Sequence, residues 1–208
     1  AFAPERVVLL PLYPQFSTTT TESSLRDWTR AAKAAGLDAP TSAVCCYPVE
    51  EGFVAALVEQ TAAALIDAAR AGKPRVLFSA HGLPKRTIAR GDPYQRQVEA
   101  TASAVAGKMG LDAADWVVCY QSRVGPLEWI GPATGDEIAR AGADGVPVVV
   151  VPIAFVSEHS ETLVELDIEY RHLAETVGVP RYVRAPAVAE HPRFIEGLAR
   201  QVAAAAAA

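Results

Sequence analysis

The 208-residue sequence contains little cysteine, a single methionine and none of several widespread catalytic motifs. Its three cysteines, Cys45, Cys46 and Cys119, form neither a CxxC motif nor an even disulfide framework, which is typical of a reducing cytoplasm. The patterns GxGxxG, GxxxxGK[ST], HExxH and GxSxG are all absent. The sequence therefore offers no motif for dinucleotide binding, a P-loop, a zinc protease or a serine hydrolase.

Long apolar runs and blocks of like charge are missing as well. No uninterrupted apolar run approaches the roughly 20 residues of a membrane span, and the opening AFAPERVVLL does not have the pattern of a signal peptide. Lys and Arg number 19 against 24 Asp and Glu, and this net charge of −5 argues against a nucleic-acid-binding surface. We expect a cytoplasmic protein, and composition leaves peripheral membrane contact open.

Short apolar runs alternate with helical stretches along most of the chain. Most of these runs are apolar on both faces, as the central strands of a covered parallel sheet should be. The alternation predicts a doubly wound α/β fold with parallel sheets flanked by helices. The expected strands are 6–14, 42–48, 74–82, 116–125, 147–155 and, more weakly, 181–188.

Several helices between these strands carry start signals. Thr19 with Glu22, and Thr134 with Glu137, have the spacing of a capping box, and Asp92 precedes Pro93 as an N-cap precedes an N1 proline. The remaining helices are expected at 50–72 and 157–178. The Thr/Ser-rich turn STTTTESS before the first helix has two interpretations, a simple cap, which is the commoner case, or an anion site.

His81 lies where an apolar strand ends, directly before the chain-breaking Gly82-Leu83-Pro84. Ligand sites of open α/β sheets form beyond the C-terminal ends of strands. A histidine at this position can act as a general base or bind a transition metal. It can equally fix the turn by a hydrogen bond to a carbonyl group, and the two readings carry equal weight.

The stretch FVSEHSETLVELDIEY, residues 155–170, places five carboxylates and a histidine after the most apolar strand. In an α-helix its glutamates at 158, 161, 165 and 169 form one stripe, because they are spaced by three and four residues. Asp167 points elsewhere, and His159 lies with the apolar residues. A solvated helix face is the usual meaning of such a stripe. A histidine beside carboxylates also suits Fe²⁺, Mn²⁺ or Zn²⁺.

The segment YQSRVGPLEWIGP follows another strand and carries Trp129 between two Gly-Pro pairs. An aromatic side chain on such a loop can line a flat apolar pocket or plug the core, and the plug is more common.

Together these segments make the sequence similar to the ferrochelatases, which insert ferrous iron into a porphyrin. The resemblance covers nearly the whole chain in order and spacing. It rests on LYPQFSTTTTESSL, LFSAHGLPKRTIARGDPY, VVCYQSRVGPLEWIGP and PIAFVSEHSETLVELDIEY. It implies a chelatase fold of two similar lobes with a porphyrin cleft between them. Gly82 stands where serine is more usual in the family.

The resemblance also implies site residues. His81 and Glu161 correspond to the catalytic pair, and both count as candidate metal ligands. Glu158 and His159 correspond to the acid and histidine just before that glutamate and also count as candidate metal ligands. The remaining matches are the metal-path acids Glu165 and Glu169 and the porphyrin-pocket residues Tyr13, Trp129 and Phe155.

The implied substrates are protoporphyrin IX and Fe²⁺, joined to form protohaem in the last step of haem biosynthesis. Alternatives are chelation of coproporphyrin or sirohydrochlorin, and a non-catalytic metal- or tetrapyrrole-binding fragment. Some members bind an iron–sulfur cluster; Thr18 stands where certain of them place a cysteine, so we expect no cluster. Whether His81 takes protons or first binds iron stays open.

The resemblance lacks the family's N-terminal part, which sets the expected domain organisation. We expect residues 1–70 to be the remainder of the N-terminal lobe with connecting helices, and residues 71–180 to form the C-terminal chelatase lobe. Residues 181–208 should form a strand and a helix that pack back on the body.

Overall fold

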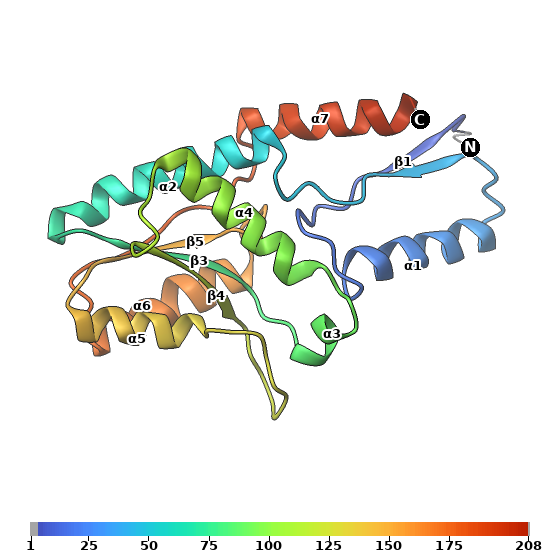
Figure 1. Ribbon diagram of the computed structural model, residues 1–208. Helices are drawn as coiled ribbons and strands as arrows, with labels where there is room; N and C mark the ends of the chain where they lie inside the picture. The colour runs from blue at the N-terminus through green and yellow to red at the C-terminus, as the bar shows by residue number, and fades with distance from the viewer. Residues whose placement is uncertain (1–3, 208) are drawn as a thin grey trace.

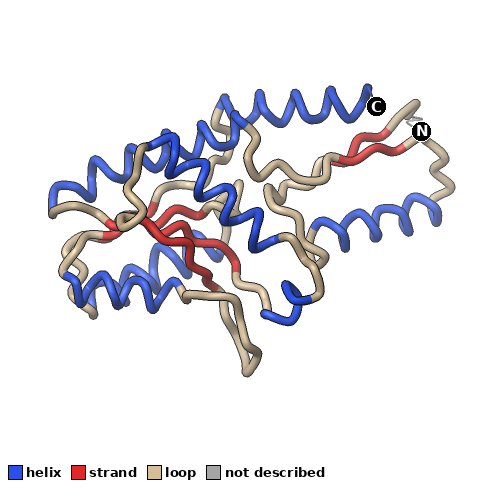
Figure 2. Tube along the Cα trace, viewed as in Figure 1, coloured by secondary structure: helices blue, strands red, loops and turns tan. Residues whose placement is uncertain are grey.

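The computed structural model describes residues 4–207 and contains two separate parallel sheets (Figures 1 and 2). The smaller sheet pairs β1 (Val7–Leu9) with β2 (Thr41–Ala43). The larger sheet has the order β4-β3-β5-β6. Its strands are β3 (Arg75–His81), β4 (Trp116–Gln121), β5 (Val148–Pro152) and β6 (Tyr182–Arg184). The six expected strands are therefore confirmed, each shorter than its apolar run.

Helices connect and cover these strands. The first is α1 (Thr21–Ala34), beside the smaller sheet, and a π-helix (Glu161–Glu169) leads directly into α6 (Tyr170–Thr176). A 3₁₀ turn (Ala69–Ala71) extends α2. The other helices are α2 (Glu51–Ala68), α3 (Lys85–Ala89), α4 (Tyr94–Met109), α5 (Thr134–Asp144) and α7 (Pro192–Ala207).

The larger sheet separates two apolar cores, with α2, α4 and α7 on one face and α5 and α6 on the other (Figure 1). Because side chains alternate along a strand, Phe78 of β3 packs into the first core while Leu77 packs into the second. All five residues of β5 are buried. This is the doubly wound α/β architecture that the sequence predicts.

Register fixes which residues meet at the functional end of the sheet. β3 lies between β4 and β5, and His81 at its end pairs with Gln121 at the end of β4. Ser79 pairs with Pro152 at the end of β5. The segments that follow these three strands therefore emerge at one edge.

Two expected capping boxes are wrong. The helix α1 begins at Thr21, and Thr19 instead bonds the Ser17 hydroxyl at 2.8 Å. The side chain of Thr134 lies within hydrogen-bond distance of the Ser79 hydroxyl, at 2.9 Å, and is fully buried. Both hydroxyl groups make tertiary contacts in place of local caps. The Asp92 prediction is close. Its carboxylate accepts the Tyr94 N–H at 2.9 Å, but α4 begins at Tyr94, one residue later than expected.

One helix meets length and composition criteria for a membrane span, although uninterrupted apolar runs suggest none. It covers Glu51–Ala71, and half of its most apolar window is buried in the structure. It packs against α4, α7 and the larger sheet, so its apolar residues are those of a core helix.

Two helical glycines predict opposite effects of the same substitution. A Cβ on Gly142 of α5 would collide with the Val177 carbonyl oxygen, whereas a Cβ on Gly107 of α4 would meet nothing within 4 Å. We expect Gly142→Ala to lower the free energy of unfolding by about 1–3 kcal/mol, as overpacking does. Gly107→Ala should raise it by about 0.5–1 kcal/mol. Urea denaturation measures both, and changes of the same sign would contradict this packing.

Candidate active site

The centre of the candidate site is a bonded pair, His81 and Glu161. His81 Nδ1 lies 2.6 Å from Glu161 Oε2, and both side chains are about one-third exposed, at 41% and 32%. The Tyr94 hydroxyl donates to the His81 carbonyl at 3.0 Å, which fixes the backbone at the end of β3. Within residues 4–207 no hydrogen bond reaches His81 Nε2. The pair thus orients the ring and leaves its second nitrogen for a ligand.

Ser122 joins the two central carboxylates and was missed by the sequence analysis. Its hydroxyl lies 3.0 Å from Glu161 Oε2 and 2.5 Å from Glu165 Oε2, and its N–H donates to Glu165 Oε1 at 2.7 Å. Its φ of 58° is unusual for a residue with a side chain. The available signal was a polar pair, Gln121-Ser122, directly after a strand; its proximity to His81 depends on a register that sequence does not show.

Gln121 supports the same carboxylates from a fully buried position. Its Nε2 donates to Glu165 Oε2 at 3.1 Å and to the Glu161 carbonyl at 3.3 Å. Its Oε1 accepts from the Ser79 hydroxyl at 2.8 Å, which fixes the orientation of the amide. The strand ends therefore hold Glu165 in place by Gln121 and Ser122 together.

The expected regular α-helix over this acidic stretch is wrong, because residues 161–169 form a π-helix. Bonds from i to i+5 put more residues in each turn, so a spacing of four no longer aligns side chains as closely. Glu161 and Glu165 still share Ser122, but Glu169 is exposed and makes no hydrogen bond within residues 4–207. The structure does not bring Glu169 to the pair.

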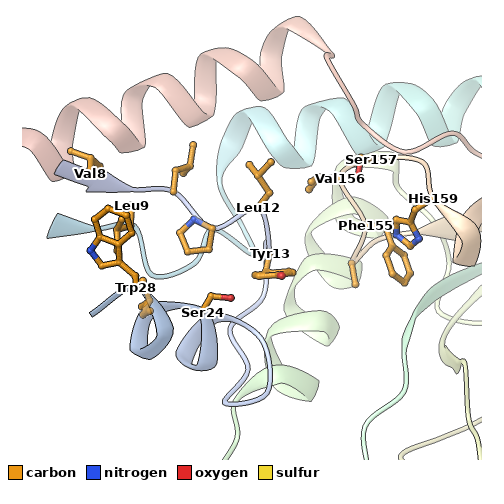
Figure 3. A pocket seen from close by; sticks show the side chains of 14 residues that line it. Val8, Leu9, Leu12, Tyr13, Ser24, Trp28, Phe155, Val156, Ser157 and His159 are labelled. Carbon is orange, nitrogen blue, oxygen red and sulfur yellow. The ribbon is translucent and has the colours of Figure 1, made fainter. Parts of the chain in front are cut away.

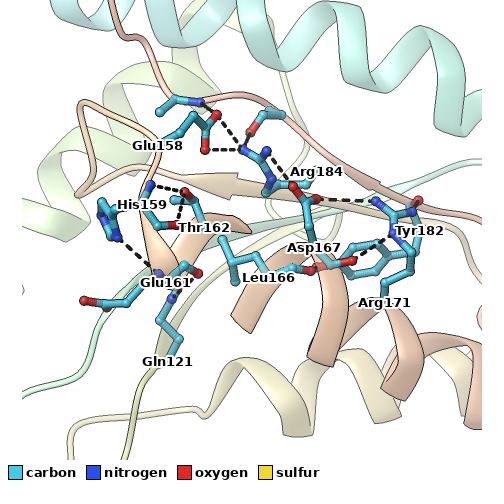
Figure 4. Close-up of polar contacts among 12 residues, drawn as sticks. Gln121, Glu158, His159, Glu161, Thr162, Leu166, Asp167, Arg171, Tyr182 and Arg184 are labelled. Atoms are coloured by element: carbon cyan, nitrogen blue, oxygen red, sulfur yellow. Dashed lines mark hydrogen bonds and ion pairs between the residues drawn. The ribbon is translucent and has the colours of Figure 1, made fainter. Parts of the chain in front are cut away.

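The Glu158 side chain points toward Arg184 and lies apart from the Glu161 side chain (Figure 4). Both of its oxygens accept from Arg184 Nη1, at 2.9 and 3.1 Å, and Oε1 also accepts the Ala187 N–H at 2.9 Å. Burial alone would raise the pKa of Glu158, but hydrogen bonds from Thr162, Ala187 and Arg184 lower it overall. Its carboxylate is thus occupied by an ion pair.

His159 lies beside the pair, but its Nδ1 is occupied. It accepts the Glu161 N–H at 3.1 Å, which selects the neutral tautomer with its proton on Nε2. The ring packs edge-on against Phe155 with centroids 4.8 Å apart. Phe155 and His159 form one wall of the site (Figure 3).

Two cavities adjoin this wall. One of about 400 Å³ is lined by His81, Glu161, Tyr13, Phe155 and His159 among others. A second, of about 560 Å³, shares Tyr13, Phe155 and His159 and extends along β1 and α1 (Figure 3). Both volumes fall within the 300–1,000 Å³ usual for ligand sites. The two cavities are thus neighbours that share one aromatic wall, and His81 and Glu161 line the smaller of them.

Trp129 lines neither cavity. It is half-buried, packs near Gly82 and forms a β-bridge with Pro84. This arrangement matches the alternative stated above, in which the Trp129 ring packs into the core, here next to the turn at Gly82–Pro84.

The pair shifts the pKa of each partner in the direction that favours charge. The bond to Glu161 raises the pKa of His81 above 6.5, despite an opposing effect of burial. The same bond lowers the pKa of Glu161 below 4.5, again against burial, with a further contribution from Ser122. Within residues 4–207, no three His, Cys, Asp or Glu side chains form a preassembled metal-binding group.

A family model for ferrochelatase matches residues 1–206 of the sequence. The chain belongs to the ferrochelatase family. It is 55% identical over 202 residues to the ferrochelatase of Caulobacter vibrioides (strain NA1000 / CB15N), covering 97% of this chain and 57% of that protein. It is 48% identical over 198 residues to the ferrochelatase of Wolbachia pipientis wMel, covering 95% and 62%. The chain thus spans less than two thirds of these curated relatives.

Solved structures show the same fold at low sequence identity. SirB from Bacillus subtilis, solved with Fe³⁺, matches with a TM-score of 0.67 and 14% identity, covering 98% of this chain and 72% of that one. DR2241 from Deinococcus radiodurans, described as similar to chelatases, matches with a TM-score of 0.59 and 15% identity over 97% of this chain and 42% of that one. The chelatase-like α/β fold is thereby confirmed.

The ion pair predicts a dependence of His81 titration on Glu161. Glu161→Gln should lower the pKa of His81, because the neutral amide no longer favours the imidazolium. NMR of the ring protons measures this pKa, and Glu175→Gln, an exposed acid on α6, is the matched control. An unchanged His81 pKa in Glu161→Gln would show that the pair does not form in solution.

The same pair sets a pH window for stability. His81 has a raised folded pKa, so its contribution is complete below about pH 6.5 and disappears as pH rises through that pKa. Glu161 has a lowered folded pKa, so its contribution is complete above about pH 4.5 and disappears as pH falls through that pKa. The pair therefore stabilises the fold most between these values.

Ser122 allows its hydroxyl and its backbone strain to be separated. Ser122→Ala removes the hydroxyl and keeps a side chain at positive φ, whereas Ser122→Gly removes the hydroxyl and the strain together. We expect the glycine variant to be more stable than the alanine variant by about 1 kcal/mol. Denaturant unfolding compares them, and equal stability would be inconsistent with a left-handed conformation here.

Proposed function

We propose that this chain forms part of a protoporphyrin ferrochelatase, which inserts Fe²⁺ into protoporphyrin IX to give protohaem and two protons. The observation that carries the proposal is the His81–Glu161 pair at the wall of an apolar cavity of about 400 Å³. A flat, largely apolar substrate suits this cavity, and the polar pair meets it at one end. Iron is a substrate in this reaction.

Proton removal is the first requirement of the proposed chemistry. A free porphyrin carries two pyrrole N–H protons that must leave as the metal enters. When the His81 ring is neutral and carries its proton on Nδ1 toward Glu161, its Nε2 lone pair can accept a proton. Glu161 stabilises the imidazolium that forms. This division of roles favours His81 as the base over His81 as the first iron ligand.

Delivery of iron is the second requirement. Carboxylate oxygens accept Fe²⁺, and the oxygens of Glu161 and Glu165 meet at the Ser122 hydroxyl. The described residues hold no preassembled group of three ligands, which supports transient passage of iron over tight storage. We propose Glu165 as the acid next to the centre. Glu169, which is exposed, is proposed as the position where iron first binds from solvent.

Holding the ring is the third requirement, and it falls to Tyr13 and Phe155, which line both cavities. A ring held between rigid aromatic walls can be bent toward the shape in which its nitrogens reach the metal. His159 presents an Nε2–H donor on the same wall. Two similar lobes around the porphyrin remain part of this proposal.

We propose a cytoplasmic location and no iron–sulfur cluster on these residues. The three cysteines are fewer than the four that such a cluster commonly uses. At the position where certain relatives have cysteine, the Thr18 hydroxyl donates to Asp92 at 2.7 Å.

The loop between β4 and α5 projects from the body of the structure (Figure 2). It carries Val124 and Leu127, which are 72% and 40% exposed and support peripheral membrane contact.

Metal insertion tests the proposal directly. The 208-residue chain and the product of the complete gene are each supplied with Fe²⁺ and one tetrapyrrole, and insertion is followed by absorbance. We expect insertion into protoporphyrin IX, and a loss of at least about 100-fold in His81→Ala, the usual scale for a general base. Glu175→Gln should retain the activity.

The other outcomes identify the competing functions. A preference for coproporphyrin or sirohydrochlorin would change the substrate while keeping the mechanism. Porphyrin binding without insertion by the folded full-length product would indicate a non-catalytic binding protein. Activity that survives His81→Ala would overturn the role of the pair.

A further inference from the structure

Arg184 at the end of β6 makes the most enclosed ion-pair cluster beside the site. Its side chain is only 9% exposed. Its Nη1 donates to both oxygens of Glu158, at 2.9 and 3.1 Å, and its Nη2 donates to Asp167 Oδ2 at 2.7 Å (Figure 4). One planar guanidinium therefore bonds two carboxylates of the same acidic stretch, and Arg171 Nη2 adds a second, longer ion pair to Asp167 at 3.4 Å.

The two carboxylates bracket the reactive ones in the sequence. Glu158 comes just before Glu161, and Asp167 comes just after Glu165. The π-helix begins after Glu158 and includes Asp167; such helices are rare and occur frequently at functional sites. Arg184 thus joins both sides of the segment that presents Glu161 and Glu165 to the strand ends.

Neutral contacts from the same region strengthen this attachment without replacing it. The Tyr182 hydroxyl donates to the Leu166 carbonyl at 2.8 Å, and the Ala187 N–H donates to Glu158. Each fixes one point of the acidic segment. Within residues 4–207, only Arg184 bonds the side chains of both Glu158 and Asp167. Loss of its charge leaves the partly buried Glu158 without a cation and leaves Asp167 with Arg171 alone, at 3.4 Å.

We propose that Arg184 is a positioning residue, which clamps the π-helix so that Glu161 and Glu165 stay in reach of His81 and Ser122. It touches no reacting atom and acts through Glu158 and Asp167. The metal-binding part of this inference rests on the proposed function, whereas the clamp itself is a statement about the fold. A lysine cannot replace it fully, because one ammonium group lacks the fork that spans two carboxylates.

Amide hydrogen exchange tests the clamp without any substrate. Peptides covering residues 157–170 are compared in the unmodified chain, Arg184→Met and Arg181→Met. Arg181, directly before β6, is the matched control. It pairs with Asp67 at 2.7 and 2.8 Å and makes no hydrogen bond to residues 155–170. We expect exchange at least about tenfold faster in Arg184→Met, because loss of even one of its charged hydrogen bonds corresponds to a change of that size.

Two further variants separate loss of the clamp from general unfolding. Arg184→Met/Glu158→Gln/Asp167→Asn removes all three charges of the clamp, so no carboxylate is left without its cation. Arg171, which pairs with Asp167, is 43% exposed and keeps its bonds to the carbonyls of Asp167 and Tyr182. We expect this variant to fold by circular dichroism and still to exchange about tenfold faster over 157–170. Arg184→Lys should give an intermediate rate. Exchange in the triple variant equal to that of Arg181→Met would overturn the proposal.

Binding of Co²⁺, an absorbing substitute for Fe²⁺, tests the positioning role. We expect Arg184→Met to bind Co²⁺ at least about tenfold more weakly than the unmodified chain, and Arg181→Met to bind it equally well. Equal weakening in both variants would make Arg184 an ordinary stabilising residue. If the unmodified chain binds no Co²⁺, the proposed metal function fails for these residues, while the exchange result still decides whether the clamp exists.

Discussion

The site depends on the register of three parallel strands. β3 lies between β4 and β5, and its last residue, His81, pairs with Gln121. That single pairing puts Gln121 and Ser122 beside His81, and the chain leaving β5 brings Glu161 to the same edge. A shift of one residue would turn each of these side chains to the opposite face of the sheet. The buried cores on both faces therefore protect the chemistry as well as the fold.

The acidic stretch is tolerated because its charges have different partners. Glu158 and Asp167 pair with Arg184, and Asp167 also pairs with Arg171, whereas Glu161 faces His81. Among residues 4–207, no cation is in hydrogen-bond contact with Glu165, which is held by neutral donors from Ser122 and Gln121. A carboxylate that is well hydrogen-bonded but not neutralised keeps its attraction for a metal ion. The uneven distribution of partners thus distinguishes the acids held by arginine from those proposed to receive iron.

Sequence patterns predicted the six strands and the fold class because apolar periodicity reports burial directly. The partnership of His81 with Glu161 came from family resemblance, since no local rule joins residues so far apart. Ser122 and Gln121 were missed because their roles follow from strand register. The α-helix expected at Glu161–Glu169 was wrong for a similar reason: local spacing cannot show that Arg184, from a later strand, holds that segment. Capping failed at Thr134 because Ser79 competes for its hydroxyl.

The two departures from regular backbone meet at the same carboxylates. Ser122 adopts a φ of 58°, and Glu161 and Glu165 lie on a π-helix. A left-handed φ at a residue with a side chain costs about 1–3 kcal/mol and persists only where surrounding contacts determine it. A π-helix is likewise rare outside functional sites. Here the contacts come from opposite sides, because β4 supplies Gln121 while β6 supplies Arg184. Relaxing either irregular conformation, the φ of Ser122 or the π-helix, would move the oxygens that meet at Ser122. The irregular backbone and the proposed metal path therefore depend on the same contacts.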